Sequence, residues 1–151
     1  VPKSEAERKS LWDIRENFEA ILEKQPYYLY DVSLPIKDMP AYVSDVQNAL
    51  QDQFTAASCY VLGHVADGNL HLFLCPGESG DWHESCDKVV YGPLKNFEGS
   101  ISAEHGIGTE KISWLGISRS EPEIALMRQL KAAMDPNKIL GAGRVIPPAE
   151  S

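Results

Sequence analysis

The chain has 151 residues, of which 43% are hydrophobic and 24% charged, and its formal net charge is −8 at pH 7. Such values are ordinary for a globular domain, and a domain of this length buries about 68–70% of its unfolded surface. The negative charge argues against nucleic acid as a partner, because phosphate binding needs a basic face. No apolar run approaches the roughly 18 residues of a membrane span.

The cysteines and the N-terminus carry information on the cellular location of the chain and on whether it is a fragment. Cys59, Cys75 and Cys86 are odd in number and show no CxxC spacing, so we expect reduced thiols and a cytoplasmic location. The N-terminus lacks the apolar core of a signal peptide and does not begin with Met. We therefore expect residues 1–151 to form a single domain that is a fragment of a longer protein.

The first part of the chain predicts a helix, a strand and a second helix. Residues 5–24 carry apolar side chains at helical spacing, and Ser4 is a suitable N-terminal cap. The apolar stripe consists of Leu11, Ile14, Phe18, Ile21 and Leu22. Residues 28–34 alternate in polarity and stop at Pro35, as a strand would. Residues 38–54 have a second helical stripe.

The remainder predicts a hairpin, a helix, a short strand and two more helices. These elements cover residues 57–75, 79–98 with a break at Gly92-Pro93, 99–103, 109–115 and 120–134. Ser120 caps the last helix, whose apolar residues are expected to face inward: Ile124, Met127, Leu130 and Met134. Helices on one face of a mostly antiparallel sheet predict an α+β fold, with a ferredoxin-like arrangement.

The predicted hairpin brings two histidines together. If Asp67 and Gly68 form a two-residue loop, His64 lies directly opposite His71. Opposed residues have Cβ atoms about 4.5–5.5 Å apart, so both imidazoles can reach one metal ion. A pair of exposed histidines on a sheet edge is the plainer alternative. Asn69 lies just inside the turn, either to donate to a substrate oxygen or only as a turn residue.

A second motif, SAEHGIG, places Glu104 and His105 beside two glycines. In a regular strand these side chains would point to opposite faces, but Gly106 and Gly108 allow the backbone to turn so that both converge. Glu104 would then complete a two-histidine, one-carboxylate set for Zn²⁺, Mn²⁺ or Fe²⁺. His105 would stay free as a general base. The alternative is a solvated loop with no metal.

Three segments together carry a resemblance to a known family. Residues 63–71 (GHVADGNLH), 102–108 (SAEHGIG) and 135–140 (DPNKIL) resemble the C-terminal domain of FAD-linked oxidases. That family includes D-lactate dehydrogenases, the glycolate oxidase flavin subunit and D-2-hydroxyglutarate dehydrogenase. The resemblance spans about residues 10–146. It implies an FAD cofactor, held mainly by an N-terminal domain of the same parent chain.

The resemblance also implies roles for individual residues. A divalent metal, for which zinc is our first expectation and manganese or iron the alternatives, would be held by His64, His71 and Glu104. The position of His105 removes the hydroxyl proton of a 2-hydroxy acid. Asn69 contacts substrate, and Arg15 pairs with a carboxylate, although on a helix it could equally be a solvated charge.

Two departures from the family pattern narrow the range of substrates that we expect. Leu29 stands where the 2-hydroxyglutarate enzymes have Lys, and Glu19 where they have Thr. Both family residues hold a distal carboxylate, so their absence favours a monocarboxylate resembling D-lactate or glycolate. We therefore expect the substrate- and metal-binding half of an FAD-dependent dehydrogenase, inactive alone. A metal-dependent hydrolase and a non-catalytic ferredoxin-like binding domain are the alternatives, and a homodimer is left open.

Overall fold

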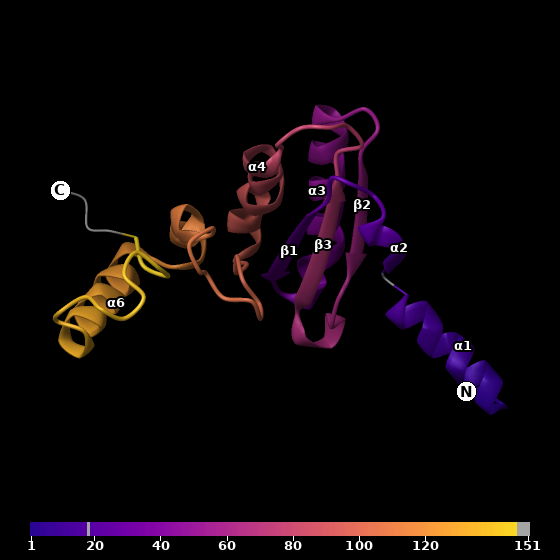
Figure 1. Ribbon diagram of the computed structural model, residues 1–151, viewed down its shortest axis with the longest axis horizontal. Helices are drawn as coiled ribbons and strands as arrows, with labels where there is room; N and C mark the ends of the chain where they lie inside the picture. The colour runs from indigo at the N-terminus through magenta and orange to yellow at the C-terminus, as the bar shows by residue number, and fades with distance from the viewer. Residues whose placement is uncertain (18, 148–151) are drawn as a thin grey trace.

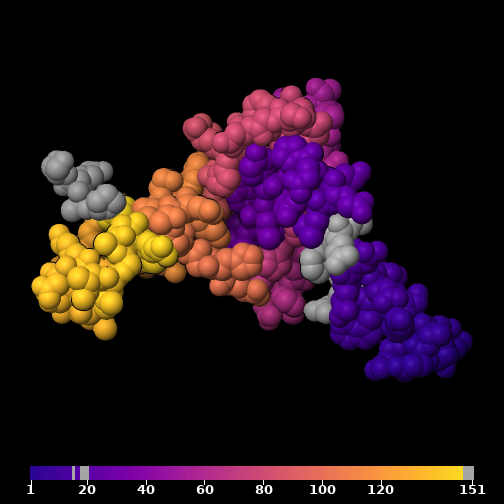
Figure 2. Space-filling model, in the orientation of Figure 1, coloured from indigo at the N-terminus to yellow at the C-terminus, as the bar shows by residue number. Residues whose placement is uncertain are grey.

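The structure, a computed structural model, describes residues 1–17 and 19–147, and it describes the side chains of all of them except residues 15, 19 and 20. Its helices and strands are α1 (Glu5–Glu16), α2 (Glu19–Leu22), β1 (Tyr28–Ser33), α3 (Met39–Gln53), β2 (Ser58–Leu62), β3 (Asn69–Cys75), α4 (His83–Leu94), α5 (Leu115–Ser118) and α6 (Glu121–Met134). The sheet lies at the centre, with α1 and α6 projecting at opposite ends (Figure 1). In the space-filling view both ends form separate lobes (Figure 2).

The sheet is antiparallel, with strand order β1-β3-β2. The α+β class predicted from the sequence is confirmed. The predicted strand over 99–103 is wrong, since only one bridge, between Ser33 and Ser100, extends the sheet there. The reason is that side chains take its amides: those of Ile101 and Ser102 donate to the hydroxyls of Ser118 and Ser100, and that of Ala103 donates to the carboxylate of Asp31. With three strands in the described sheet, the ferredoxin-like arrangement stays a prediction.

One face of the sheet packs against α3 and α4 and forms the core. Val32, Leu72, Val46 and Val90, from two strands and both helices, are fully buried. The Tyr42 hydroxyl donates to the carbonyl oxygen of Val90 and ties the two helices together. Since side chains alternate along a strand, Asp31 and His71 point away from this core to the opposite face.

Several predicted helices form, but with different ends or burial. Ser4 caps α1 through its side chain, as predicted, yet this helix ends at Glu16 and its Leu11 and Ile14 are exposed. In α6, Ser120 caps the helix as expected, through a capping box with Glu123, and Ile124 is buried. The helix nevertheless leaves two of its predicted inward residues, Leu130 and Met134, exposed.

The predicted break at Gly92-Pro93 is wrong, because α4 continues to Leu94 with Pro93 in its last turn. A proline near the end of a helix costs few backbone hydrogen bonds, and buried Leu94 holds this turn in the core. Within the described part of the chain, no helix has the length and apolarity needed to cross a membrane.

The chain after α6 folds back toward the middle of the molecule. Asp135 is buried and accepts hydrogen bonds from the backbone amides of Ile139 and Leu140. Further along, the Val145 amide donates to the carbonyl oxygen of Gly108, at 2.8 Å. The third segment of the resemblance therefore has a structural role, and the tail that follows it is tied to the second motif.

Leucine truncation should separate core from exposed apolar positions. Leu72→Ala removes a fully buried side chain, so we expect it to lower the free energy of unfolding by about 2–5 kcal/mol. Leu130→Ala, the matched control at an exposed position, should change it by less than about 0.5 kcal/mol. Denaturant titration measures both, and equal losses would contradict the placement of the core.

Candidate metal centre and general base

The loop between β2 and β3 differs from the predicted two-residue turn. It spans residues 63–68, and Leu62, not His64, lies opposite His71. The predicted hairpin register is therefore wrong. The longer loop forms because Gly63 and Gly68 adopt positive φ angles of 149° and 75°. It is held in place by the amide of Leu34, which donates to the carbonyl oxygen of Gly68.

Glu104 nevertheless brings both histidines of the hairpin to one place. Its Oε1 lies 3.7 Å from Nδ1 of His64, and its Oε2 lies 4.0 Å from Nε2 of His71. Two donors bound to one zinc ion at about 2.0–2.2 Å can be at most about 4.4 Å apart. Each histidine is therefore close enough to Glu104 to share a metal ion with it.

Asn69 lies beside this carboxylate at the start of β3. Its side-chain amide is buried and donates to Oε1 of Glu104 at 2.6 Å. The other end of the amide, Oδ1, is buried without a hydrogen-bond partner among the described residues. An orphaned buried acceptor is costly unless something fills the place next to it. The site is therefore suited to a further donor or cation at this point.

His105 joins the group from the second motif. Its ring lies 5.4 Å from the ring of His71, with 32° between the planes. Gly106 and Gly108 have φ angles of 81° and 58°, so the predicted glycine-assisted turn is confirmed. The chain therefore turns just after Glu104 and His105.

Asp31 is a site residue that sequence reasoning missed. It lies opposite His71 in the sheet and is fully buried. Its carboxylate accepts hydrogen bonds from the Ser102 hydroxyl and from the backbone amides of Ala103, Glu104 and His105. The available signal was a charged residue in the middle of an alternating strand, a position where charge is rarely buried without partners.

The charge of Asp31 is well compensated. Burial by itself would raise the pKa of this carboxyl, but the amide and hydroxyl donors and the Lys111 ammonium together lower it below its usual value. Nζ of Lys111 lies 3.8 Å from Oδ2 of Asp31. Burial in turn lowers the pKa of Lys111, although Asp31 opposes that effect. Asp31 is therefore ionised at neutral pH.

Two sets of side chains have the donor chemistry of a metal site. Asp31, His71 and His105 are the one set of three, among the described residues, whose donor atoms all lie within 4.8 Å of one another. However, Oδ2 of Asp31 already accepts four hydrogen bonds. The carboxylate of Glu104 is half exposed, accepts one hydrogen bond from Asn69 and faces both His64 and His71. The latter set therefore has the freer carboxylate, whereas Asp31, His71 and His105 have the tighter cluster of donor atoms.

Of the three residues named in the substrate argument, the structure describes the side chain of Leu29 alone. Arg15 belongs to α1, and its side chain is outside the described part of the structure; the same holds for the side chain of Glu19. Leu29 is exposed and shares a sheet face with Asp31, two positions along β1. The predicted role of Arg15 therefore stays a prediction.

Comparison with known proteins gives a consistent result over nearly the whole chain. A profile described as FAD linked oxidases, C-terminal domain, matches residues 1–145. A protein of Xanthomonas citri named D-2-hydroxyglutarate dehydrogenase is 38% identical, covering 96% of this chain and 32% of the relative. A mitochondrial protein of the same name from Danio rerio is 36% identical, covering 92% of this chain and 26% of the relative. A protein of Schizosaccharomyces pombe named "Putative D-lactate dehydrogenase C713.03, mitochondrial" is 36% identical, covering 93% of this chain and 29% of the relative.

Acid should selectively weaken the contribution of Asp31. Because its pKa is lowered in the folded state, the stability it contributes is full above the unfolded pKa of about 3.9 and is lost as the pH falls through the folded value. We expect Asp31→Asn to destabilise the chain at pH 7 and the difference from wild type to shrink below about pH 4. Denaturant titrations across this range measure it, and a difference independent of pH would contradict the assignment.

Proposed function

The chain belongs to the family of FAD linked oxidases, C-terminal domain, and on that premise we propose that it is the substrate- and metal-binding part of an FAD-dependent dehydrogenase. The proposed reaction oxidises a small 2-hydroxy acid to the 2-oxo acid. The observation that carries the proposal is the convergence of His64 and His71 on Glu104, with His105 beside them. A hydrolase with the same ligands would need no flavin, which makes the two activities separable.

We propose His64, His71 and Glu104 as the metal ligands, with zinc as the first expectation and manganese or iron as alternatives. Two imidazoles and one carboxylate leave coordination positions open, as in catalytic metal sites. Such an ion supplies Lewis-acid chemistry, lowering the pKa of a hydroxyl group bound to it. Asn69 supports this set by donating to Glu104, which fixes the carboxylate between the two imidazoles.

His105 is the proposed general base. Its imidazole is exposed on the open side of the site, so a substrate hydroxyl can approach it. Its ring is tilted against that of His71, so it lies beside the proposed ligands without itself being needed to complete the set. Oxidation of a 2-hydroxy acid releases the hydroxyl proton and a hydride from C2. His105 takes the proton, and FAD, held by the domain outside this chain, would supply the hydride acceptor.

The substrate we propose is a monocarboxylate such as D-lactate or glycolate. Relatives carry both names, D-2-hydroxyglutarate and D-lactate dehydrogenase. The exposed, apolar Leu29 lies on the sheet face that carries Asp31 and His71, and an apolar side chain there offers nothing to a second carboxylate. Arg15 and the unpartnered Oδ1 of Asn69 are the proposed contacts to the substrate.

The rest of the enzyme lies outside this chain, which spans about a quarter to a third of the length of the curated relatives it matches. We propose that an FAD-binding domain of the parent protein completes the active site, so that this chain alone does not turn over. Exposed apolar side chains of α6 and the segment after it, including Leu130, Met134 and Ile139, support such a docked domain. A cytoplasmic location stays a prediction, since the names of several relatives include "mitochondrial".

Metal titration of the chain itself tests the ligand set. We expect stoichiometric Zn²⁺ binding by calorimetry, and at least about 100-fold weaker binding for His64→Ala, His71→Ala and Glu104→Gln, since even loss of a residue that merely orients a ligand costs 10–100-fold. His83→Ala is the matched control, because His83 is paired with Asp87 elsewhere. Equal affinity of all four variants would rule out this site.

Kinetics of the full-length parent enzyme test the base and the substrate. We expect His105→Ala to lower kcat by about 10²–10⁴-fold, the usual contribution of a general base, while flavin content stays unchanged. A loss below tenfold would rule out that role.

In the same wild-type enzyme, D-lactate and glycolate should outperform D-2-hydroxyglutarate in kcat/KM. A preference for the dicarboxylate would overturn the substrate proposal while leaving the reaction type intact. Ester or amide hydrolysis by the isolated chain would favour the hydrolase instead.

A further inference from the structure

We propose that Asp31 is a positioning residue, whose buried carboxylate sets the backbone of residues 102–105 so that Glu104 and His105 act on the same site. This inference rests on the proposed function, because it takes Glu104 as a metal ligand and His105 as the base. Asp31 itself touches neither substrate nor metal in this scheme. It acts through the chain segment it binds.

The contacts of Asp31 account for the conformation of that segment. Three consecutive backbone amides, those of Ala103, Glu104 and His105, point to one carboxylate at 2.9–3.1 Å. Successive amides that converge in this way form a concave anion-binding backbone. A regular strand cannot do so, because its amides and its side chains alternate in direction. The segment therefore leaves the strand conformation, and the side chains of residues 104 and 105 are not forced to opposite faces.

The segment is also tied to the correct part of the sheet. Asp31 and His71 are direct partners across β1 and β3, so whatever Asp31 binds is held next to His71. The Ser102 hydroxyl donates to Asp31 and accepts from the amide of Gly106, which extends the anchored region to the glycine turn. One carboxylate thus fixes the distance of the second motif from the hairpin motif.

Direct metal binding by Asp31 is the competing explanation, since its carboxylate lies within 4.8 Å of donor atoms of His71 and His105. Four donors engage Oδ2, and Oδ1 also accepts from the amide of Glu104. A metal bound there would displace amides that have no other partner on the sheet, because the expected strand over 99–103 is absent. The hydrogen-bond inventory therefore favours the anchoring role.

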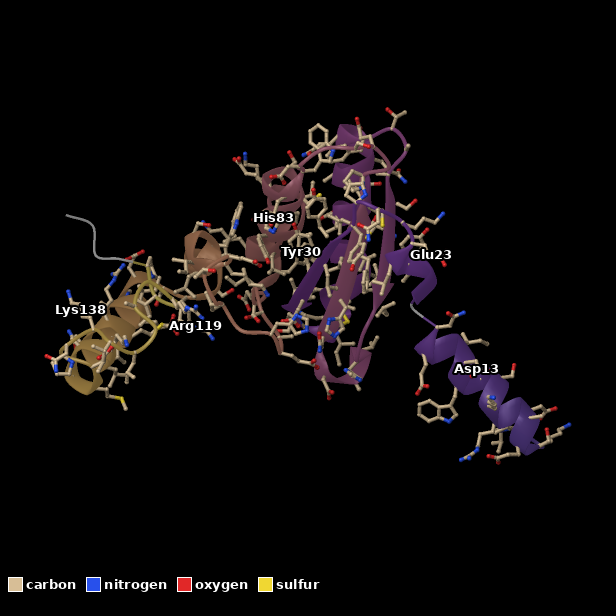
Figure 3. All side chains as sticks on the ribbon, viewed as in Figure 1. Asp13, Glu23, Tyr30, His83, Arg119 and Lys138 are labelled. Atoms are coloured by element: carbon tan, nitrogen blue, oxygen red, sulfur yellow. The ribbon has the colours of Figure 1, made fainter. Side chains whose placement is uncertain are left out.

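Asp87 provides a matched control for the structural cost of removing a buried carboxylate. It lies on α4, is 8% exposed, and accepts hydrogen bonds from the Tyr30 hydroxyl and the Trp114 indole. Tyr30 and His83, labelled in Figure 3, mark this cluster beside α4. Since Tyr30 and Asp31 are adjacent in β1, they point to opposite faces of the sheet. Asp87→Asn should therefore destabilise the fold while leaving the hydrogen bonds of Asp31 to residues 102–105 in place.

Binding of Co²⁺ to the chain reports whether Glu104 is correctly positioned, and it does so without requiring catalysis. We expect Asp31→Asn to bind Co²⁺ about 10–100-fold more weakly than wild type, the usual loss when a residue that orients a ligand is removed, and to alter the visible absorption of the bound ion. Asp87→Asn should retain wild-type affinity within threefold and an unchanged spectrum. Asp31→Asn with wild-type affinity and spectrum would overturn the proposal.

Amide hydrogen exchange separates this proposal from the proposed function. In metal-free chain, Asp31→Asn should speed exchange at residues 103–105 while the amides of β3 stay protected, and Asp87→Asn should leave residues 103–105 unchanged. If wild type binds no Co²⁺, the metal site fails, and exchange alone decides whether Asp31 anchors the segment. Retained protection at 103–105 overturns the anchor in either case.

A milder variant guards against loss of folding in Asp31→Asn. Ser102→Ala removes one donor to the carboxylate and the acceptor of the Gly106 amide, at a partly exposed position. It should speed exchange at residues 103–105 and weaken Co²⁺ binding more than threefold. Wild-type values in both measurements would overturn the proposal.

Discussion

A buried negative charge has to find hydrogen-bond donors, and the way Asp31 finds them shapes the site. The strand β1 places this carboxylate on the face of the sheet that the two core helices leave open. Within the described part of the chain no further strand covers it, so the backbone of the second motif bends around it and donates three amides. An ionised carboxylate without such partners would be strongly destabilising in this position. The conformation of Glu104 and His105 follows from that requirement.

The hairpin contributes His64 and His71 to the site, and a different backbone feature positions them. Two glycines with positive φ angles allow a six-residue loop between β2 and β3, and the Leu34 amide fixes the loop through Gly68. His71 comes from the strand itself, whereas His64 comes from the loop. Glu104 lies between them because its own segment is fixed to the same strand pair. Two independent backbone constraints thus meet at one carboxylate.

Features with strong local signals were predictable from the sequence. The capping residue Ser120, the alternating strand β1 and the stripe of α3 depend on neighbours a few positions away, and each formed as expected. The predicted hairpin register is wrong because the loop is held by the amide of Leu34, a residue more than 30 positions before Gly68 in the chain. The strand over 99–103 failed for the same kind of reason, since the amides of Ile101 and Ala103 donate to side chains distant in the chain, those of Ser118 and Asp31. The exposed stripes of α1 and α6 show that periodicity predicts an apolar face but not what covers it.

The chemistry assigned to this domain depends on two histidines and one carboxylate holding a single ion. X-ray absorption spectroscopy of the zinc-loaded chain tests that claim most directly, because it reads the ligand atoms around the metal. The account predicts only nitrogen and oxygen neighbours at about 2.0–2.2 Å, with the outer scattering of two imidazoles that is lost stepwise in His64→Ala and His71→Ala. A sulfur neighbour at about 2.3 Å, from one of the three free cysteines, or a zinc ion without imidazole ligands would contradict it.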